Sequence, residues 1–325
     1  MVGLHVDTIG SGAPLLLVHG WGMHGGVWKH VATKLAQHFR VHCVDLPGHG
    51  FNRNFPFARH SRESGNPAKI KVPRSGQNND VDPLSREFFN QLDSRLRGND
   101  VIRSNGKPEF NVGRDLSRLD SVGINPDLHL DTIVDELSAQ FSEPLAICGW
   151  SLGGQIALRW AIRHPQQINR LVLVATTPCF VQRPNWPCAM AAETLTEFSV
   201  ALQEDFAQTL RRFVTLQMRG SDRERELLAD LRQRLFDRGE PDVAALQGGL
   251  EILRNTDLRA QLSQITQATL VISGERDMLT PLPAAKYLAQ NLPAARLVKI
   301  AGAAHAPFLS HPDSFIEHVT DFMHE

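Results

Sequence analysis

The feature that most restricts how this chain can fold is a short apolar run that leads into a glycine-flanked serine. Leu145-Ala146-Ile147-Cys148 has the length of a buried strand, and Gly149-Trp150-Ser151-Leu152-Gly153 follows it directly. Residues 153–164 then show the composition of a helix. A G-x-S-x-G segment between a strand and a helix is typical of a sharp turn that raises the serine hydroxyl above the edge of a sheet. Glycines flank the serine because a side chain there would clash with the neighbouring strand or helix.

The rest of the chain repeats this alternation of strand and helix. We expect strands at residues 14–18, 40–45, 145–148, 171–174, 269–272 and 297–300, and helices at residues 27–39 and 153–164. Such alternation predicts a mostly parallel sheet with helices on both faces. Together with the serine turn, it predicts the α/β class and, within it, the α/β-hydrolase fold.

Two segments interrupt the alternation, and the longer of them predicts helices. Residues 178–257 have helical periodicity and predict a helical cap on a core made of residues 1–177 and 258–325. The apolar residues of this cap are expected on one stripe, formed by Phe198, Leu202, Phe206, Leu210, Phe213 and Leu216.

The other segment, residues 57–125, is poor in apolar residues and has no sustained period. It carries a degenerate repeat, since Ser-Arg-x-x-Gly-Asn occurs at residues 61–66 and again at residues 94–99. A stretch of this composition cannot bury enough apolar area to offset the entropy of ordering it. We therefore interpret it as a poorly ordered insertion in the core rather than a functional domain, although residues 84–96 fit a short helix.

Composition and charge argue against several classes of function. The formal net charge of -1 gives no overall attraction to nucleic acid or to a membrane surface. No stretch is apolar enough to cross a bilayer, and an acid stands where a signal peptide would be apolar. The four cysteines show neither metal-ligand spacing nor the density of a disulfide scaffold. We expect a cytoplasmic monomer that contacts neither nucleic acid nor membrane and uses no metal and no cofactor.

A serine hydroxyl is a weak nucleophile at neutral pH and needs a base beside it, and in this fold the acid and the histidine follow the serine in that order. Asp277 comes just after the predicted strand that ends at Ser273, with Glu275 as the competing carboxylate. Among fourteen histidines, His305 alone follows the next strand with small neighbours. Catalytic groups gather at the carboxyl ends of strands in open sheets. The sequence thus predicts Ser151 as nucleophile, His305 as general base and Asp277 as the acid that orients the histidine.

The oxyanion of a tetrahedral intermediate needs two N–H donors held in place in advance. One is expected from the backbone of Leu152, which follows the nucleophile. The other is expected from Trp21 in the loop His19-Gly20-Trp21-Gly22, where glycines allow the backbone to approach closely. The alternative for this loop is a simple tight turn. The rings of Trp21 and Trp150 are also expected to wall an apolar acyl pocket.

Several motifs together resemble those of one family, the pimeloyl-acyl-carrier protein methyl ester esterases of biotin synthesis. Two of them are the serine turn Gly149-Trp150-Ser151-Leu152-Gly153-Gly154 and the loop at His19. More specific are motifs in the predicted cap and at the histidine: Thr177-Pro178-Cys179-Phe180, Trp186-Pro187, Asp205-Phe206, Arg212-Phe213, Leu216-Gln217, Gly248-Gly249-Leu250-Glu251-Ile252-Leu253 and Ala303-Ala304-His305-Ala306-Pro307-Phe308. The resemblance covers almost the whole chain except residues 57–125.

This resemblance implies hydrolysis of the methyl ester on a pimeloyl chain that acyl-carrier protein carries, with release of methanol. It implies substrate contacts from the following residues: Trp21, Ser151, Leu152, Phe213, Val214, Thr215, Leu216, Gln217 and His305. A carrier protein is generally acidic, and residues 211–238 are rich in arginine, a side chain suited to phosphate and carboxylate. Carrier contacts are therefore expected from Arg211, Arg212, Arg223 and Arg225, with a solvated helix face as the alternative.

Other functions would share the same catalytic residues. A general short-acyl carboxylesterase and a proline-type aminopeptidase of the same fold would have the triad but not the cap motifs. A non-enzymatic scaffold is a further alternative, against which the complete set of catalytic and oxyanion residues argues. Hydrolysis of a p-nitrophenyl ester separates enzyme from scaffold, and a peptide substrate separates esterase from peptidase.

The interpretation of residues 57–125 can be tested by deletion. A variant in which a short polar bridge replaces these residues should fold and hydrolyse a p-nitrophenyl ester at a rate close to that of the full chain. Long surface insertions change the loop-closure entropy little, by about 0.6 kcal/mol for each doubling of length. An insoluble or inactive deletion variant would show instead that the segment is structural or binds substrate.

Overall fold

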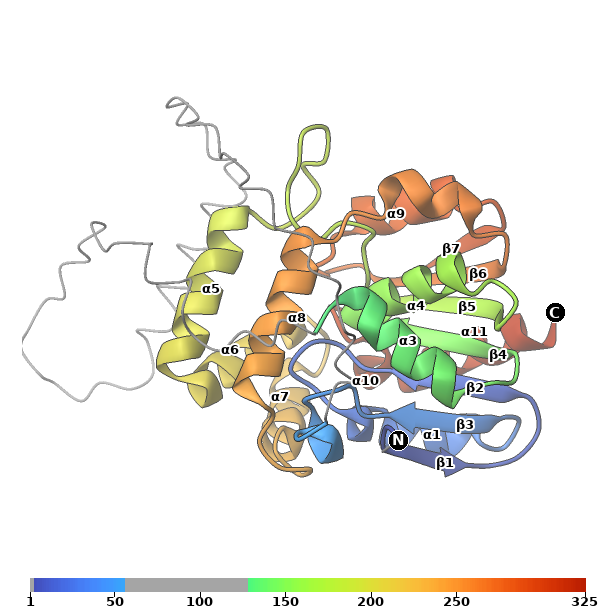
Figure 1. The fold of residues 1–325 in the computed structure, drawn as a ribbon, viewed down its shortest axis with the longest axis horizontal. Coiled ribbons are helices and arrows are strands. Elements are labelled where there is room, and N and C mark those ends of the chain that lie inside the picture. Colours follow the sequence, from blue (N-terminus) through green and yellow to red (C-terminus); the bar gives the residue numbers. More distant parts are fainter. Residues whose placement is uncertain (1–2, 56–127) are drawn as a thin grey trace, which may run out of the picture. The chain divides into compact units, whose positions relative to one another are not determined.

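The computed structural model of this chain describes residues 3–55 and 128–325. The predicted insertion at residues 57–125, with its short helix, lies outside the described residues. Within them, seven strands form one sheet in the order β1-β3-β2-β4-β5-β6-β7 (Figure 1). The strands are β1 (Val6–Ile9), β2 (Pro14–Val18), β3 (Arg40–Val44), β4 (Leu145–Trp150), β5 (Ile168–Val174), β6 (Ala268–Gly274) and β7 (Ala295–Ile300).

Strands β2 to β7 are parallel to one another, and β1 pairs with β3 in the antiparallel direction. The central strand β4 is buried along its whole length, which explains why its sequence is continuously apolar instead of alternating. This arrangement confirms the predicted α/β class and mostly parallel sheet. Strand β1 was not predicted, because this edge strand is partly exposed and has no apolar run that marks it.

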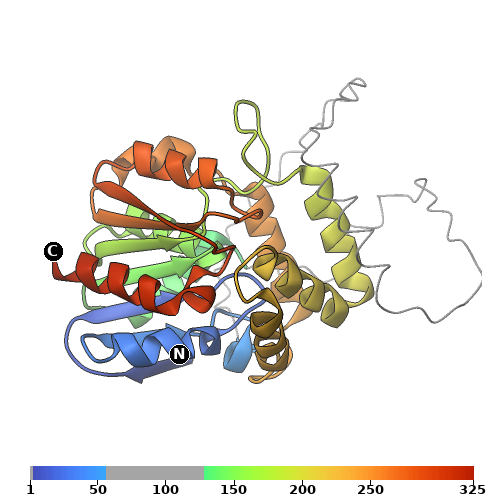
Figure 2. The ribbon, with the colours of Figure 1, turned by 180° about the vertical axis from the view of Figure 1, so that it is seen from behind.

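The sheet is covered by helices on both faces, as predicted. Figure 1 shows α3 (Leu130–Gln140), α4 (Leu152–Arg163) and α9 (Leu282–Asn291) on one face. In Figure 2, seen from behind, α1 (Lys29–Leu35) and α11 (Pro312–His324) cover the other face. The short elements η1 (Gly25–Trp28), η2 (Gly50–Asn52), η4 (Arg259–Gln264) and α10 (Pro307–Ser310) complete the connections. No helix in the described ranges combines the length and the hydropathy needed to span a membrane.

Four further helices, which we call the cap helices, lie between β5 and β6 in the chain. They are α5 (Ala192–Glu204), α6 (Phe206–Met218), α7 (Glu224–Arg234) and α8 (Val243–Asn255). The predicted single apolar stripe is divided between two of them, because the helix breaks at Asp205. The carboxylate of Asp205 accepts the backbone N–H of Gln208 at 2.9 Å and so begins α6.

Candidate active site

Ser151 occupies a strained turn between β4 and α4. Its backbone has φ 56° and ψ -116°, a conformation that side-chain-bearing residues rarely adopt. The turn is held from both sides, since the N–H of Ser151 donates to the carbonyl of Val174 at 3.0 Å and its own carbonyl accepts the hydroxyl of Thr176 at 2.6 Å. Hydrogen bonds from the neighbouring strand and loop therefore fix the place of the serine above the sheet edge.

The glycines around Ser151 are required by close packing. A Cβ on Gly149 would lie 2.3 Å from the carbonyl oxygen of Gly153, and a Cβ on Gly153 would lie 2.4 Å from that of Val18. Gly20, after β2, approaches the serine itself, because a Cβ there would lie 3.2 Å from the Cβ of Ser151. The predicted reason for these glycines, clash with a neighbouring strand or helix, agrees with the observed contacts.

His305 and Asp277 lie together, buried, at the carboxyl ends of β7 and β6. Nδ1 of His305 is 2.9 Å from Oδ2 and 3.1 Å from Oδ1 of Asp277. The carboxylate also accepts the backbone N–H groups of Leu279 and Thr280, and the Thr280 hydroxyl at 2.7 Å. These donors hold the carboxylate in place, and the carboxylate in turn holds the imidazole in one orientation. Thr280 was not predicted as part of the site, because its contact with Asp277 depends on the fold of this turn.

The competing carboxylate, Glu275, is placed differently. Its side chain accepts a hydrogen bond from Lys299 at 2.7 Å on the exposed side of the sheet edge. That bond lowers the pKa of Glu275. Asp277, and not Glu275, is therefore the acid that faces His305.

The histidine is fixed by its backbone as well as by its ring. Its N–H donates to the carbonyl of Gln217 on α6 at 3.1 Å, and its carbonyl accepts the indole N–H of Trp150 at 2.7 Å. The other ring nitrogen, Nε2, is buried and has no hydrogen-bond partner among the described residues. The structure thus brings Asp277 onto His305, but it shows no hydrogen bond between Nε2 and Ser151. Such catalytic hydrogen bonds are often loose before substrate binds.

The predicted oxyanion donors lie in the loop after β2 and at the start of α4. The backbone N–H groups of Trp21 and Leu152 donate to no acceptor within the part of the chain that the structure describes. The side chain of Trp21 is buried, and its indole N–H donates to the carbonyl of Leu246 on α8 at 2.7 Å. Its ring packs edge-on against Phe213, with centroids 4.9 Å apart, and against Phe198. Trp21 therefore joins the loop to the cap helices.

Trp150 does not form the pocket wall that we expected. Its ring is fully buried and packs against Phe308, with centroids 5.0 Å apart, and against Trp28. These aromatic neighbours are themselves buried in the hydrophobic core, Trp28 at the end of η1 and Phe308 in α10. The ring of Trp150 lies 5.7 Å from that of His305, and its indole N–H binds the carbonyl of His305.

The predicted substrate run on α6 reaches the site at its two ends. Phe213 contacts Trp21, and the carbonyl of Gln217 binds the backbone of His305. Gln217 is buried, and neither atom of its side-chain amide has a partner among the described residues. Between them, Val214 is buried, while Thr215 accepts a hydrogen bond from Arg232 on α7. Leu216 is half-buried.

The four arginines expected to contact a carrier differ in their surroundings. Arg223 forms an ion pair with Glu226, so its charge is largely neutralised, and the guanidinium of Arg211 lies 5.8 Å from the ring centre of Phe236. Arg212 and Arg225 are exposed on α6 and α7, and neither has an ion pair within the described ranges.

Two buried histidines were given no role of their own from the sequence: His19, in the loop of residues 19–24 between β2 and η1, which we call the oxyanion loop, and His49. Nδ1 of His19 lies 2.8 Å from the carbonyl of Gly20, and Nε2 accepts the N–H of Leu46 at 2.9 Å. The ring of His49 lies 5.3 Å from that of His19. Burial lowers the pKa of His19 well below its ordinary value, and burial also lowers that of His49. These histidines are therefore neutral near pH 7, and none belongs to a metal-binding group among the described residues.

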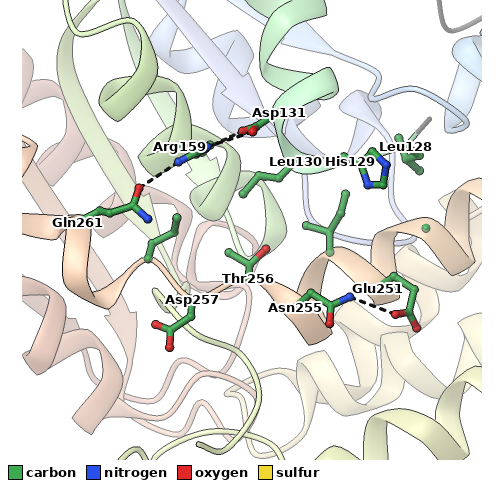
Figure 3. Close-up of a pocket in the computed structure, with 13 residues that line it drawn as sticks. Leu128, His129, Leu130, Asp131, Arg159, Glu251, Asn255, Thr256, Asp257 and Gln261 are labelled. Atoms are coloured by element: carbon green, nitrogen blue, oxygen red, sulfur yellow. Dashed lines mark hydrogen bonds and ion pairs between the residues drawn. The ribbon is translucent and has the colours of Figure 1, made fainter. Parts of the chain in front are cut away.

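A separate pocket of about 600 Å³ lies between α3, α4, α8 and η4 (Figure 3). Several of its polar side chains bind one another: Arg159 binds both carboxylate oxygens of Asp131 and the amide oxygen of Gln261, and the amide N–H of Asn255 binds Glu251. None of the predicted catalytic residues lines this pocket.

The sheet order, the strained serine turn and the buried histidine–aspartate pair define an α/β hydrolase. A family model described as alpha/beta hydrolase fold matches residues 13–312. Solved structures share the fold, among them an esterase from Exiguobacterium antarcticum (TM-score 0.68, 19% identity, 99% of this chain and 96% of that one). A bromoperoxidase from Bacillus anthracis is similar as well (TM-score 0.70, 18% identity, 98% and 95%).

Curated relatives place the chain in one family within the α/β hydrolases. The chain is 38% identical over 316 residues to the pimeloyl-acyl-carrier protein methyl ester esterase of Nitrosomonas europaea, with 97% of this chain and 98% of that protein covered. It is 34% identical to the proteins of the same name from Nitrosospira multiformis (99% and 98% covered) and Chromobacterium violaceum (98% and 98%). The chain belongs to the family of pimeloyl-acyl-carrier protein methyl ester esterases, which confirms the resemblance drawn from its motifs.

The buried histidines predict how stability depends on pH. Well above the ordinary histidine pKa of 6.5, His19 and His49 are neutral in the folded and the unfolded chain alike, so they add no pH dependence there. Below 6.5, the unfolded chain binds protons that the folded chain refuses, because burial lowers these pKa values. The free energy of unfolding should fall by up to about 1.4 kcal/mol per pH unit for each histidine.

Urea unfolding at pH 7.5, 6.5 and 5.5 measures this effect. In His49→Asn, the amide retains a donor in place of Nδ1. The free energy of unfolding should then fall less below pH 6.5, by the contribution of one histidine. A decline equal to that of the unmodified chain would show that His49 is protonated in the folded state.

Proposed function

We propose that this chain hydrolyses the methyl ester of pimeloyl-acyl-carrier protein to methanol and the free carboxylate. The observation that carries the proposal is the buried contact between His305 Nδ1 and Asp277 Oδ2, 2.9 Å long, at the same sheet edge as the strained turn of Ser151. The names of the curated relatives support the choice of substrate.

In the proposed mechanism, Ser151 Oγ attacks the ester carbonyl while His305 Nε2 takes its proton. Asp277 stabilises the imidazolium that forms, and the N–H groups of Trp21 and Leu152 bind the oxyanion. Collapse of the tetrahedral intermediate breaks the bond to methoxide, which leaves as methanol with the proton from His305. Water then attacks the acyl-enzyme by the same route and releases the carboxylate and Ser151. All of these steps use side chains and backbone groups of the chain itself.

The acyl chain is proposed to lie against apolar side chains between the core and the cap helices. Trp21, Phe198 and Phe213 pack edge-on against one another there. Contact with such rings removes apolar area of the substrate from water, which stabilises the complex by about 25 cal/mol for each Å² buried. Residues 178–257 would then act as a cap domain on a core of residues 1–177 and 258–325. We propose further that the protein works as a cytoplasmic monomer.

Replacement of the proposed triad tests the mechanism. Ser151→Ala and His305→Ala should each lower kcat by about 10⁴-fold or more, because triad members act as a unit. Asp277→Asn should lower kcat by about 10⁴-fold, since the imidazole loses the partner that fixes its tautomer. Hydrolysis of a p-nitrophenyl ester and of the carrier-bound methyl ester provides the measurement.

Glu275→Gln is the matched control for the aspartate, because Glu275 bonds to Lys299 on the exposed side. It should retain the kcat of the unmodified enzyme. Near-normal turnover by Ser151→Ala would show that another residue is the nucleophile.

Carrier recognition is proposed for Arg212 and Arg225. Charges on a surface mainly raise the association rate, and salt screens them over a Debye length of about 8 Å at physiological ionic strength. The double reversal Arg212→Glu with Arg225→Glu should lower kcat/KM for the carrier-bound ester by about tenfold at low salt. Raising the salt concentration should reduce this difference, and turnover of a small free ester should not change.

The control is Lys29→Glu with Lys34→Glu, an equal change of charge on the exposed side of α1. It should leave kcat/KM for both substrates unaffected. A parallel loss on both substrates by the arginine variant would mean that these arginines support the fold of the cap helices. No loss on either would mean that the carrier docks elsewhere.

A further inference from the structure

Arg238, in the connection between α7 and α8, crosses from the cap helices into the core. Its Nη1 donates to the two carboxylate oxygens of Asp45 at 3.1 and 3.2 Å, and its Nη2 donates to Asp7. Asp45 follows β3 and is completely buried, and Asp7 lies in β1. The guanidinium also lies 5.1 Å from the ring centre of Phe51. One side chain from the cap thus neutralises a fully buried carboxylate of the core.

From Asp45, hydrogen bonds continue to the oxyanion loop. Oδ1 of Asp45 accepts the N–H of Gly25 at 2.6 Å, where the loop ends. The next residue, Leu46, donates its N–H to Nε2 of His19 at 2.9 Å, so Nδ1 of that ring carries the hydrogen and donates to the carbonyl of Gly20 at 2.8 Å. Both ends of the loop are therefore bound to the segment that Arg238 holds.

The bond to Gly20 has a consequence for the proposed oxyanion donor. The carbonyl of Gly20 and the N–H of Trp21 belong to one planar trans peptide, in which they point in opposite directions. The carbonyl is held by His19 and also by the N–H of Met23 at 3.3 Å. Its orientation fixes the direction of the Trp21 N–H, so a shift of Asp45 and Leu46 would turn this donor.

The same stretch of the cap contacts neighbouring loops at two other points. Nδ1 of His24 accepts the N–H of Gly26 at 3.1 Å, so Nε2 donates to the carbonyl of Arg234 at 3.0 Å. The N–H of Asp242 donates to the carbonyl of Gly48 at 2.9 Å. On the cap side these two bonds use only the backbone of Arg234 and Asp242, so they remain when the side chain at position 238 is replaced, and the contribution of the guanidinium can be isolated.

We propose that Arg238 is a positioning residue for the oxyanion hole: it holds Asp45, and through Leu46 and His19 it aims the Trp21 N–H at the developing oxyanion. The inference rests on the proposed function, in which Ser151 attacks an ester and Trp21 donates to the oxyanion. A hydrogen bond made in the transition state and not to the bound ester changes kcat and leaves KM unchanged. The proposed role thus predicts a loss of kcat alone.

Two variants at position 238 and one control test the proposal. Arg238→Met removes the charge, and Arg238→Lys retains a charge that cannot span both carboxylates. The control, Arg234→Met, removes an arginine of the same segment whose side chain pairs with Asp230 near the surface. The measurements are thermal unfolding, and kcat and KM for a p-nitrophenyl ester. They also include the inhibition constants of two matched ketones. The serine adds to a trifluoromethyl ketone and forms an oxyanion, whereas the corresponding methyl ketone only occupies the site.

Loss of a whole oxyanion donor lowers kcat by about 10²–10³-fold, so misalignment in Arg238→Met should lower it by about 10- to 100-fold. Its KM should stay within about twofold, and its affinity for the trifluoromethyl ketone should fall with kcat while that for the methyl ketone stays constant. Arg238→Lys should fall between Arg238→Met and the unmodified enzyme, and Arg234→Met should match the unmodified enzyme.

Three results would overturn the proposal. One is a folded Arg238→Met with unchanged kcat and ketone selectivity. Another is a lowered kcat together with a raised KM, weaker binding of both ketones and a lowered Tm. That result would mean that Arg238 only supports the fold. If Arg238→Met does not fold, Arg238→Lys decides: a reduced kcat with unchanged KM supports the role, and unmodified kcat and selectivity overturn it. Full activity in Ser151→Ala would overturn the proposed function instead, whatever the variants of Arg238 show.

Discussion

The backbone conformation of Ser151 is the constraint on which the rest of the site depends. A residue with φ 56° and ψ -116° is strained, and such strain persists only where the surroundings determine the conformation fully. Here β5 supplies the carbonyl of Val174, the following loop supplies Thr176, and three segments come so close that only glycine fits at positions 149, 153 and 154. The parallel strands on both sides of β4 make that closeness possible, so the conformation of Ser151 depends on the order of strands in the sheet.

The residues that carry the proposed chemistry are held as much by the cap helices as by the sheet. Gln217 on α6 accepts the backbone N–H of His305, and Trp21 donates its indole N–H to Leu246 on α8. The turn after α6 binds the loops on either side: Asp222 N–H donates to the carbonyl of Gly302, and Arg276 donates to the carboxylate of Asp222 at 2.9 Å. Displacement of the cap helices would therefore disturb the histidine loop and the oxyanion loop together.

Among the described residues, the buried carboxylates of Asp45 and Asp277 each have several hydrogen-bond partners. Asp277 accepts hydrogen bonds from Leu279 and Thr280 and faces His305, while Asp45 is bound by Arg238 and by the N–H groups of Gly25 and Phe51. Removal of water from a carboxylate is unfavourable unless such donors replace it. The same two carboxylates bind the two loops that the proposed reaction needs, the histidine loop and the oxyanion loop.

The sequence alone determined the six parallel strands, the α/β class and the serine turn, because these follow from patterns within a few residues: β2 has the predicted bounds, 14–18. It also gave the candidates Asp277 and His305, since chain order limits the choice. Only the tertiary structure showed that Asp277 contacts His305 while Glu275 binds Lys299, divided the cap stripe at Asp205, and placed Trp150 in the core. It alone joined Arg238 to Asp45, 193 residues away. Such pairs depend on how elements pack across the fold, and no local pattern records which distant side chain will meet another.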